Sequence, residues 1–191
     1  ALVAKIKAKD LSVQWATELK VEAPVGYNGT AKAGGQGCEV VYSEHFLYVA
    51  GTVEDGATME DAKDAKSAGR DDIFLAKLAT KDGSLYWMEQ TGSNGDDRLA
   101  RNGGVNTDQL GNAILYGDTT GDMFRMREAG DDEENRFSDL FVMMFDKNTG
   151  FHKQSLTGPK ISSYHLSRKR DGRGFMIFGG ILLGLALVAV F

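Results

Sequence analysis

The sequence predicts an all-β body built from repeated four-stranded antiparallel units, followed by one transmembrane α-helix. Three observations predict this architecture: a segment that recurs along the chain, many short apolar runs separated by glycine-rich turns, and an uncharged apolar stretch at the C-terminus. The 191 residues include 24 glycines but only 2 prolines. This composition suits tight turns and closely packed strands better than a disordered linker.

The recurring segment opens each copy with a strand, a turn and a second strand. Residues 4–18 align with residues 76–90 at an offset of 72, so that Trp15 meets Trp87. A third copy begins at Asp139 and weakens where Gln154 replaces the tryptophan. Such self-similarity is typical of folds in which one unit cannot bury its own faces and is therefore repeated and stacked.

The second copy shows the expected elements in order. A first strand at Ile73–Leu78 is followed by a "KDG" turn and a second strand that carries Trp87. A glycine- and aspartate-rich stretch leads to a third strand near Gly104–Thr107, and a "QLGN" turn leads to a fourth at Ala113–Tyr116. Four short antiparallel strands per copy is the unit of a β-propeller blade, and we therefore expect β-propeller-like packing of about two and a half blades.

These patterns divide the chain into five expected parts. They are blade-like repeats at residues 1–71 and 72–138, a partial repeat at 139–157, a basic juxtamembrane linker at 158–173 and the transmembrane helix at 174–191. The chain opens at the same point of the repeat as the third copy, and a closed propeller needs roughly 4–8 blades. We therefore expect further blades upstream, with this chain as the C-terminal part of a longer protein.

The second copy also carries a family resemblance. The stretch from Asp72 to Asp122 resembles the seven-bladed β-propeller repeat of secreted bacterial proteins and some algal surface proteins, which reads D-x-F-V-A-K-L, G-x-L-x-W, G-G-S-G-D-D and D-x-x-G-N-x-Y-x-x-G. The positions that fall on this pattern are Asp72, Phe74, Lys77, Gly83, Trp87, Gly92, Gly95, Asp96, Asp97, Asp108, Gly111, Asn112 and Gly117. The first copy departs from it with "YSEHF" in place of the Asp-x-x-Gly-Asn turn. The resemblance implies a fold and carries no shared catalytic residues.

The C-terminal stretch Gly174–Phe191 contains no charged or polar side chain. As a helix it would span about 27 Å, which is close to the hydrocarbon thickness of a bilayer, and we expect it to cross the membrane. Gly180 and Gly184 form a GxxxG pattern that lets two helices approach closely, so a homodimer through this helix is possible.

The signals for membrane orientation conflict. The basic cluster Arg168–Arg173 precedes the helix, and the positive-inside rule would make this a tail-anchored protein with a cytosolic body. Against this, Asn28–Thr30 is an N-glycosylation sequon, which acts only in the secretory lumen. Because the family resemblance is to secreted repeats, we expect the body to be extracellular or lumenal and Asn28 to be a glycosylation site.

No catalytic, cofactor-binding or metal-ligating residue is predicted. His45, His152 and His165 lack metal-binding spacing, and we expect the lone Cys38 to be a buried small residue rather than a partner of His45. "DKNTG" at Asp146–Gly150 lacks the glutamate of a calcium loop and is interpreted as a hairpin turn. Asp96 and Asp97 are interpreted as turn-capping residues, and both tryptophans as blade core.

The predicted function is that of a membrane-anchored module that binds a protein or glycan, or serves as a scaffold, without catalysis. The net charge of −5 argues against nucleic-acid binding, which requires a basic face. A single-pass accessory subunit of a larger membrane complex is the alternative. A third possibility is an enzyme whose active site lies in upstream blades.

Overall fold

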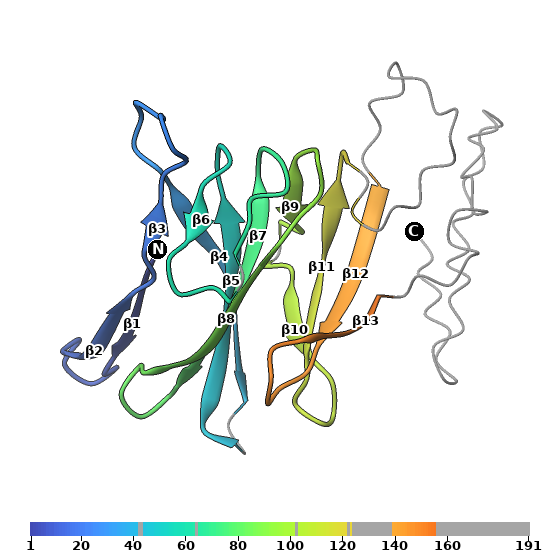
Figure 1. Cartoon of the computed structure of the whole chain (residues 1–191). Coiled ribbons are helices and arrows are strands. Elements are labelled where there is room, and N and C mark those ends of the chain that lie inside the picture. The colour runs from blue at the N-terminus through green and yellow to red at the C-terminus, as the bar shows by residue number, and fades with distance from the viewer. Residues whose placement is uncertain (42–43, 64, 102, 122, 124–138, 156–191) are drawn as a thin grey trace, which may run out of the picture.

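The computed structural model describes residues 1–41, 44–63, 65–101, 103–121, 123 and 139–155. Within these ranges the chain forms thirteen β-strands and no α-helix (Figure 1). The strands are β1 (Leu2–Ile6), β2 (Val13–Glu18), β3 (Val21–Glu22), β4 (Ala33–Val41), β5 (Phe46–Val53), β6 (Thr58–Met59), β7 (Asp72–Ala79), β8 (Leu85–Thr91), β9 (Asp97–Leu99), β10 (Val105–Thr107), β11 (Ala113–Thr119), β12 (Asp139–Phe145) and β13 (His152–Ser155).

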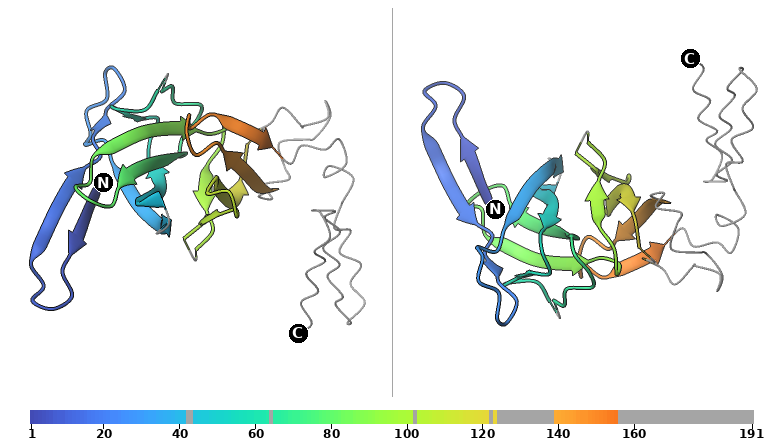
Figure 2. Two further views of the ribbon diagram at one scale, coloured as in Figure 1. Left: turned by 90° about the horizontal axis from the view of Figure 1, so that it is seen from below. Right: turned by 90° about the horizontal axis from the view of Figure 1, so that it is seen from above.

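Most of these strands belong to two large antiparallel sheets. The first has the order β4-β5-β7-β8, and the second has the order β10-β11-β12-β13 with β9 also paired to β11. Two small sheets, β1-β2 and β3-β6, lie at the N-terminal end. Figures 1 and 2 show the β1–β2 hairpin projecting from one end of the molecule, beside the first large sheet, with the second large sheet on the other side.

The mainly β character predicted from the sequence is confirmed. The prediction that the four strands of one copy form one sheet is wrong. Each large sheet joins strands from the later part of one copy to the first two strands of the next, so neither large sheet coincides with one copy. In the first large sheet, β4 and β5 come from the first copy and β7 and β8 from the second. The physical reason is that β5 and β7 are buried along their whole lengths, and pairing buries them against each other.

The predicted helix is the second correction. In the part of the chain that the structure describes, no helix is long and apolar enough to cross a membrane. The stretch Gly174–Phe191, with Gly180 and Gly184, lies outside the described residues.

The first large sheet is covered on both faces, as expected for strands without polar alternation. Alternate residues of β5 and β7 point to two different cores. The core shared with the second large sheet is formed by Phe46, Tyr48, Ala50, Ile73, Leu75, Leu99, Val105, Ala113, Leu115, Phe141, Met143 and Phe145. The core shared with the N-terminal segment is formed by Leu19, Leu47, Val49, Val53, Ala57, Met59, Phe74, Ala76, Leu78 and Met88.

The repeat is visible in packing detail as well as in sequence. Gly51 in β5 and Gly117 in β11 hold equivalent positions, and each lies against a backbone carbonyl of the neighbouring strand and a phenylalanine ring. A Cβ atom at Gly51 would lie 2.6 Å from the Phe74 ring, and one at Gly117 would lie 2.8 Å from the Phe141 ring. Glycine is required at both places because the carbonyl oxygens of Gly34 and Arg98, on the neighbouring strands of the same copies, would lie only 2.0 and 1.9 Å from an added Cβ atom.

Candidate functional site

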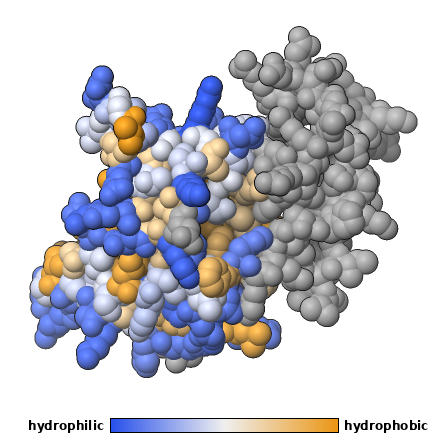
Figure 3. Space-filling model, in the orientation of Figure 1, coloured by the Kyte–Doolittle hydropathy of each residue, from blue (hydrophilic) through white to orange (hydrophobic). Residues whose placement is uncertain are grey.

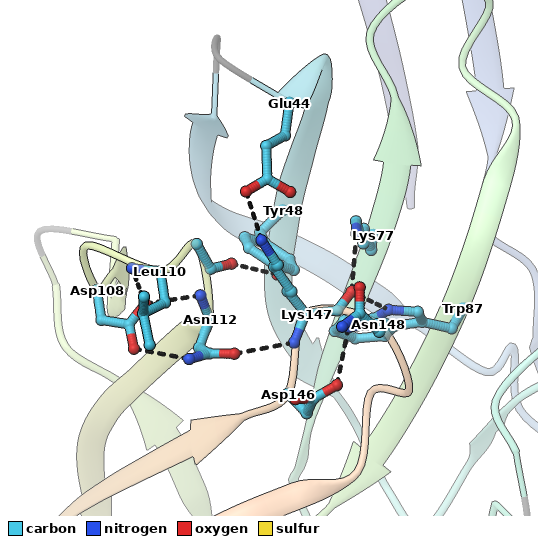
Figure 4. Close-up of polar contacts among 11 residues, drawn as sticks. Glu44, Tyr48, Lys77, Trp87, Asp108, Leu110, Asn112, Asp146, Lys147 and Asn148 are labelled. Carbon is cyan, nitrogen blue, oxygen red and sulfur yellow. Dashed lines mark hydrogen bonds and ion pairs between the residues drawn. The ribbon is translucent and has the colours of Figure 1, made fainter.

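Two side chains, one on β7 and one on β8, donate hydrogen bonds to the hairpin turn of the following copy. Lys77 and Trp87 are directly opposite each other in the β7–β8 ladder. The Lys77 Nζ donates to the backbone carbonyl of Lys147 at 2.7 Å, and the Trp87 indole Nε1 donates to the same oxygen at 3.1 Å (Figure 4). We call this arrangement, in which one lysine and one tryptophan donate to one carbonyl, the Lys–Trp clamp.

The first hairpin makes the same clamp on the second. Lys5 and Trp15 are opposite each other in the β1–β2 ladder, and they donate to the carbonyl of Thr80 at 3.0 and 3.1 Å. Thr80 precedes Lys147 by 67 residues, the offset that separates the second copy from the third. The clamp is therefore a property of the repeat: each hairpin holds the next one through its turn.

Each clamp is completed by a glycine beneath the tryptophan ring. Gly83 lies against Trp15, and Gly150 lies against Trp87, so that an added Cβ atom would come within 2.5 and 2.8 Å of the rings. Both glycines have a positive φ, of 73° and 74°, which glycine adopts without strain. At the first junction the Thr17 hydroxyl also donates to the Gly83 carbonyl at 2.7 Å.

The two lysines of the clamps differ in environment. Lys5 is exposed, whereas Lys77 is buried, with its ammonium 3.7 Å from the centroid of the Phe46 ring. Burial lowers the pKa of Lys77, and the carboxylate of Glu44 opposes this shift. The second clamp is thus the more desolvated of the two, and its hydrogen bonds gain from the lower local dielectric.

The third hairpin places other residues at the clamp positions. Met144 stands opposite Gln154 in the β12–β13 ladder, where the earlier copies pair lysine with tryptophan. The register shift of the ladder falls at the equivalent point in all three hairpins, next to Lys5, Lys77 and Met144. The backbone of the repeat is therefore kept in the third hairpin, while the lysine and the tryptophan are absent.

A polar network fixes the turns around the second clamp (Figure 4). The carboxylate of Asp108 accepts from the backbone N–H of Asn112 at 2.8 Å and from its side-chain amide at 2.7 Å. The Asn112 Oδ1 in turn accepts from the Lys147 N–H at 3.2 Å, and the Lys147 ammonium pairs with Glu44. Three turns from different strand pairs are tied together in this way.

Two buried carboxylates lie apart from the clamps. Asp97 accepts from the backbone and hydroxyl of Ser93, and Asp72 accepts from the side chain of Gln90 at 2.9 Å. The Oδ1 of Asp72 is buried without a hydrogen-bond partner among the described residues. Burial raises the pKa of both carboxyl groups, against the hydrogen bonds that they accept.

Comparison with known proteins finds neither a matching family model nor a matching curated protein.

Cys38 and His45 are not brought together. Cys38 lies on β4 opposite Val49, whereas His45 lies in the turn before Phe46. The two positions are therefore roughly 13 Å apart along the ladder at the usual rise per residue. The prediction of a buried Cys38 is wrong, because the residue is exposed. Partial desolvation raises the pKa of its thiol, which favours the less nucleophilic protonated form.

The remaining predicted residues lie in turns and loops. Asn28 is exposed in the loop between β3 and β4. The Asp146 carboxylate accepts from the N–H groups of Asn148 and Thr149 at 2.9 and 3.0 Å, as in a hairpin turn. Asp96 is 3.9 Å from Arg98 at the surface. Within the described ranges, no group of three or more His, Cys, Asp or Glu side chains could hold a metal ion.

A groove of about 610 Å³ lies at the N-terminal end of the molecule. Charged groups of both signs line it, among them Glu18, Lys32 and Glu54, and a 3.7 Å ion pair joins Lys20 to Glu60.

Sequence reasoning missed the role of the two lysines. Lys5 and Lys77 were visible as identical positions of the repeat, but their common function becomes clear only when the cross-strand tryptophans are considered with them. In the third copy the lysine and the tryptophan are both replaced, by Met144 and Gln154. This joint replacement is the signal that could have shown that the two residues act together.

Proposed function

We propose that the chain is a binding and scaffold module in which successive β-sheets are held in a fixed stack and their loops and edges contact another macromolecule. The single observation that carries this proposal is the Lys–Trp clamp, repeated with the same partners at two successive junctions. A stack of this kind presents surfaces at fixed spacings, which is how repeat proteins build extended binding faces.

The surroundings of the clamps support a structural rather than a reactive role. Both carbonyls that accept from the clamps belong to backbone turns, and the network of Asp108, Asn112 and Lys147 supplies turn hydrogen bonds. The resemblance of residues 72–122 to secreted propeller repeats points in the same direction, since that family is defined by its fold. The partner that we propose is a protein or a glycan at a membrane surface.

The test uses the full chain, extracted from native membranes with a mild detergent after brief chemical cross-linking. We expect a defined partner at fixed stoichiometry, with cross-links on the loops or sheet edges of the described region. The proposal fails if the isolated chain turns over a small substrate and one point substitution that leaves the fold intact abolishes the turnover.

An accessory subunit of a larger membrane complex is the second candidate function. One face of the β1–β2 hairpin favours it, because Leu2, Ile6 and Val13 are all exposed there. Native gel electrophoresis of the same extract separates the two candidates. Migration only within one large assembly supports the subunit, whereas a monomer that engages its partner reversibly supports the binding module.

We also propose that the described body faces the cell exterior or the lumen. The exposure of Asn28 in the β3–β4 loop supports this placement, because a glycan at this position meets no packed neighbour. Expression in eukaryotic cells should give a glycosidase-sensitive mass increase that Asn28→Gln removes. An unglycosylated body that resists external protease in intact cells contradicts the proposal.

A further inference from the structure

Two carboxyl groups are buried where the two large sheets meet. Asp72 begins β7 of the first large sheet, and Asp97 begins β9, which pairs with β11 of the second. The backbone joins these strand ends, because the Asp97 N–H donates to the Asp71 carbonyl at 2.9 Å, and Figure 1 shows β7 and β9 as neighbours. Asp72 and Asp97 are only 1 and 0 % exposed. Figure 3 shows hydrophilic residues over much of the visible surface, where water solvates their charges, and the two aspartates lack this solvation.

Gly92 allows the two carboxyl groups to approach each other. A Cβ atom at this glycine would lie 2.0 Å from Asp72 Oδ1 and 2.9 Å from Asp97 Oδ2. Both oxygen atoms thus lie within 2.9 Å of one point. Two ionised carboxylates so close together, and shielded from water, repel each other strongly, and such pairs usually retain a proton.

The charged groups around this pair do not neutralise it. Among the described residues, no lysine or arginine forms an ion pair with either carboxyl group. The Arg98 guanidinium lies 4.0 Å from Asp71 and 3.9 Å from Asp96, at the surface, and Asp71 adds negative charge near the pair. The neighbouring strands β5 and β11 place the uncharged residues Val53 and Thr119 opposite the two aspartates. A basic side chain is therefore not what compensates the pair.

The hydrogen bonds distinguish the two carboxyl groups. Both oxygens of Asp97 accept, from the N–H and the hydroxyl of Ser93. Asp72 Oδ2 accepts from the Ala68 N–H at 3.1 Å and from the Gln90 side-chain amide at 2.9 Å. Asp72 Oδ1, which faces Gly92, is buried without a partner among the described residues. An unpartnered buried oxygen is costly, and a proton on this atom would make it a donor directed toward the acceptor Asp97.

We propose that Asp72 and Asp97 hold one proton between them, carried on Asp72 Oδ1, and that this shared proton is a pH-sensitive lock between β7 and β9. When the proton leaves, two adjacent buried anions repel each other, and the contact between the two large sheets loosens. The lock is therefore closed at low pH and opens as the pH rises. This inference goes beyond the proposed binding function and does not depend on it.

The direction of the pH dependence follows from the burial of the pair. Burial is the main cause of the raised pKa of both carboxyl groups, and the charge of Asp72 adds to the shift at Asp97. A folded-state pKa above the unfolded value means that the stabilisation is complete below the unfolded pKa. It is lost as the pH rises through the folded pKa.

Carbon-13 NMR of the full chain in detergent, with labelled aspartate, measures the protonation directly. The Cγ signals of the pair are identified by their loss in Asp72→Asn and Asp97→Asn. We expect one proton to remain on the pair at a pH at which Asp82 is fully ionised, because hydrogen bonds from Ser84 lower the pKa of that exposed carboxyl group. Both signals of the pair should shift in the same steps, as coupled groups do.

Asp97→Asn tests whether the proton is shared. This variant removes the negative charge beside Asp72 and keeps a side chain of the same size. We expect the titration midpoint of Asp72 to fall by about 1 pH unit or more, because a neighbouring like charge no longer opposes its ionisation. An unchanged midpoint would show that burial alone holds the proton. If this variant does not fold, the coupled steps of the wild-type titration decide the question.

Asp72→Asn is the matched control for the lock. The asparagine side chain offers an acceptor to Ala68 and Gln90 and a donor toward Asp97, so it reproduces the protonated state without titrating. Amide exchange of Ser93 and Asp97 is corrected for its intrinsic pH dependence. In the wild type the corrected rate should rise by up to about tenfold per pH unit while the pair loses its proton. In Asp72→Asn it should stay constant.

Three results would overturn the shared proton. They are ionisation of both carboxyl groups at the pH at which Asp82 ionises, an equal pH dependence of amide exchange in the wild type and Asp72→Asn, and a titration that changes when EDTA is added. The last of these would indicate a metal ion between the carboxyl groups. Partner capture tests the binding function separately, so failure of either proposal leaves the other standing.

Discussion

The β1–β2 and β7–β8 hairpins are two copies of one sequence pattern with opposite surroundings. They share the Lys–Trp clamp, the glycine beneath the ring and the position of the register shift. Yet β1 is largely exposed, whereas β7 is buried at every position. The hairpin itself therefore forms from local sequence, whereas the clamp and the degree of burial depend on which strands and turns lie beside it.

The largest expected effect comes from truncating the same repeat position in the two hairpins. Phe74→Ala should cost about 3–5 kcal/mol of unfolding free energy, because it leaves a cavity in a core that is closed on both sides. Leu2→Ala should cost less than about 0.5 kcal/mol, as for an exposed substitution. Urea denaturation of both variants measures this, and similar losses at both positions would show that β1 is covered.

The second prediction concerns variants that remove one hydrogen-bond donor from each Lys–Trp clamp. Trp87→Phe should cost about 1–2 kcal/mol, because the Lys147 carbonyl loses a hydrogen bond in a desolvated site. Trp15→Phe should cost about 0.5–1 kcal/mol, because its clamp is open to water. The same denaturation experiment applies, with Tyr86→Phe as a control at an exposed residue of β8. A larger loss of unfolding free energy for Trp15→Phe than for Trp87→Phe would contradict the expectation that the second clamp contributes more to stability.

The third prediction uses pH and concerns Asp72 at the start of β7. Burial raises the pKa of Asp72 above its ordinary value of 3.8, with Asp71 adding to the shift. The folded state therefore holds the proton more tightly, and the stability contributed by this group is present below the unfolded pKa and lost as pH rises through the folded pKa.

The variant Asp72→Asn lacks this titration. The stability of the wild-type protein relative to Asp72→Asn should therefore fall as the pH rises from the ordinary carboxyl value of 3.8 through the raised folded pKa. Asp82→Asn serves as the control of opposite sign, because hydrogen bonds from Ser84 lower the pKa of that exposed carboxyl group. A stability difference between wild type and Asp72→Asn that does not vary with pH would contradict the raised pKa.

The smallest expected effect concerns the turn in which the copies differ. His45 occupies the place of Gly111 in the following copy, and both have a positive φ, of 59° and 83°. Replacing His45 by glycine should stabilise the protein by about 0.5–1 kcal/mol, since a side chain is disfavoured in this conformation. His45→Ala keeps the Cβ atom and should give no gain. Thermal unfolding of the two variants measures the difference.

Much of the fold could be predicted from the sequence, but the sheet partners could not. The four strands expected in the second copy all occur, and Trp15 and Trp87 hold equivalent places, because strand and turn formation follow local patterns. Pairing between copies is non-local. Its one local sign is that β5 and β7 are both predominantly apolar, which is typical of central strands.

The side-chain roles were harder to predict for a related reason. A lysine in a strand is normally interpreted as solvent-facing, and the acceptor of Lys77 is a backbone carbonyl 70 residues away in the chain. Cys38 was expected to be buried because free cysteine usually is. However, three glycines, Gly34, Gly35 and Gly37, precede it on β4 and provide little bulk around it. Without large side chains beside it, the thiol remains exposed.

That exposed thiol has a practical consequence. Cys38 is the sole cysteine of the chain, and β4 is one of the two edge strands of the first large sheet. A fluorophore or spin label can therefore be attached at one defined point without any substitution. Because the pKa of the thiol is raised, maleimide coupling will need mildly alkaline buffer. The label would sit on the sheet that lies between the N-terminal hairpin and the second large sheet, and so report distances to either neighbour.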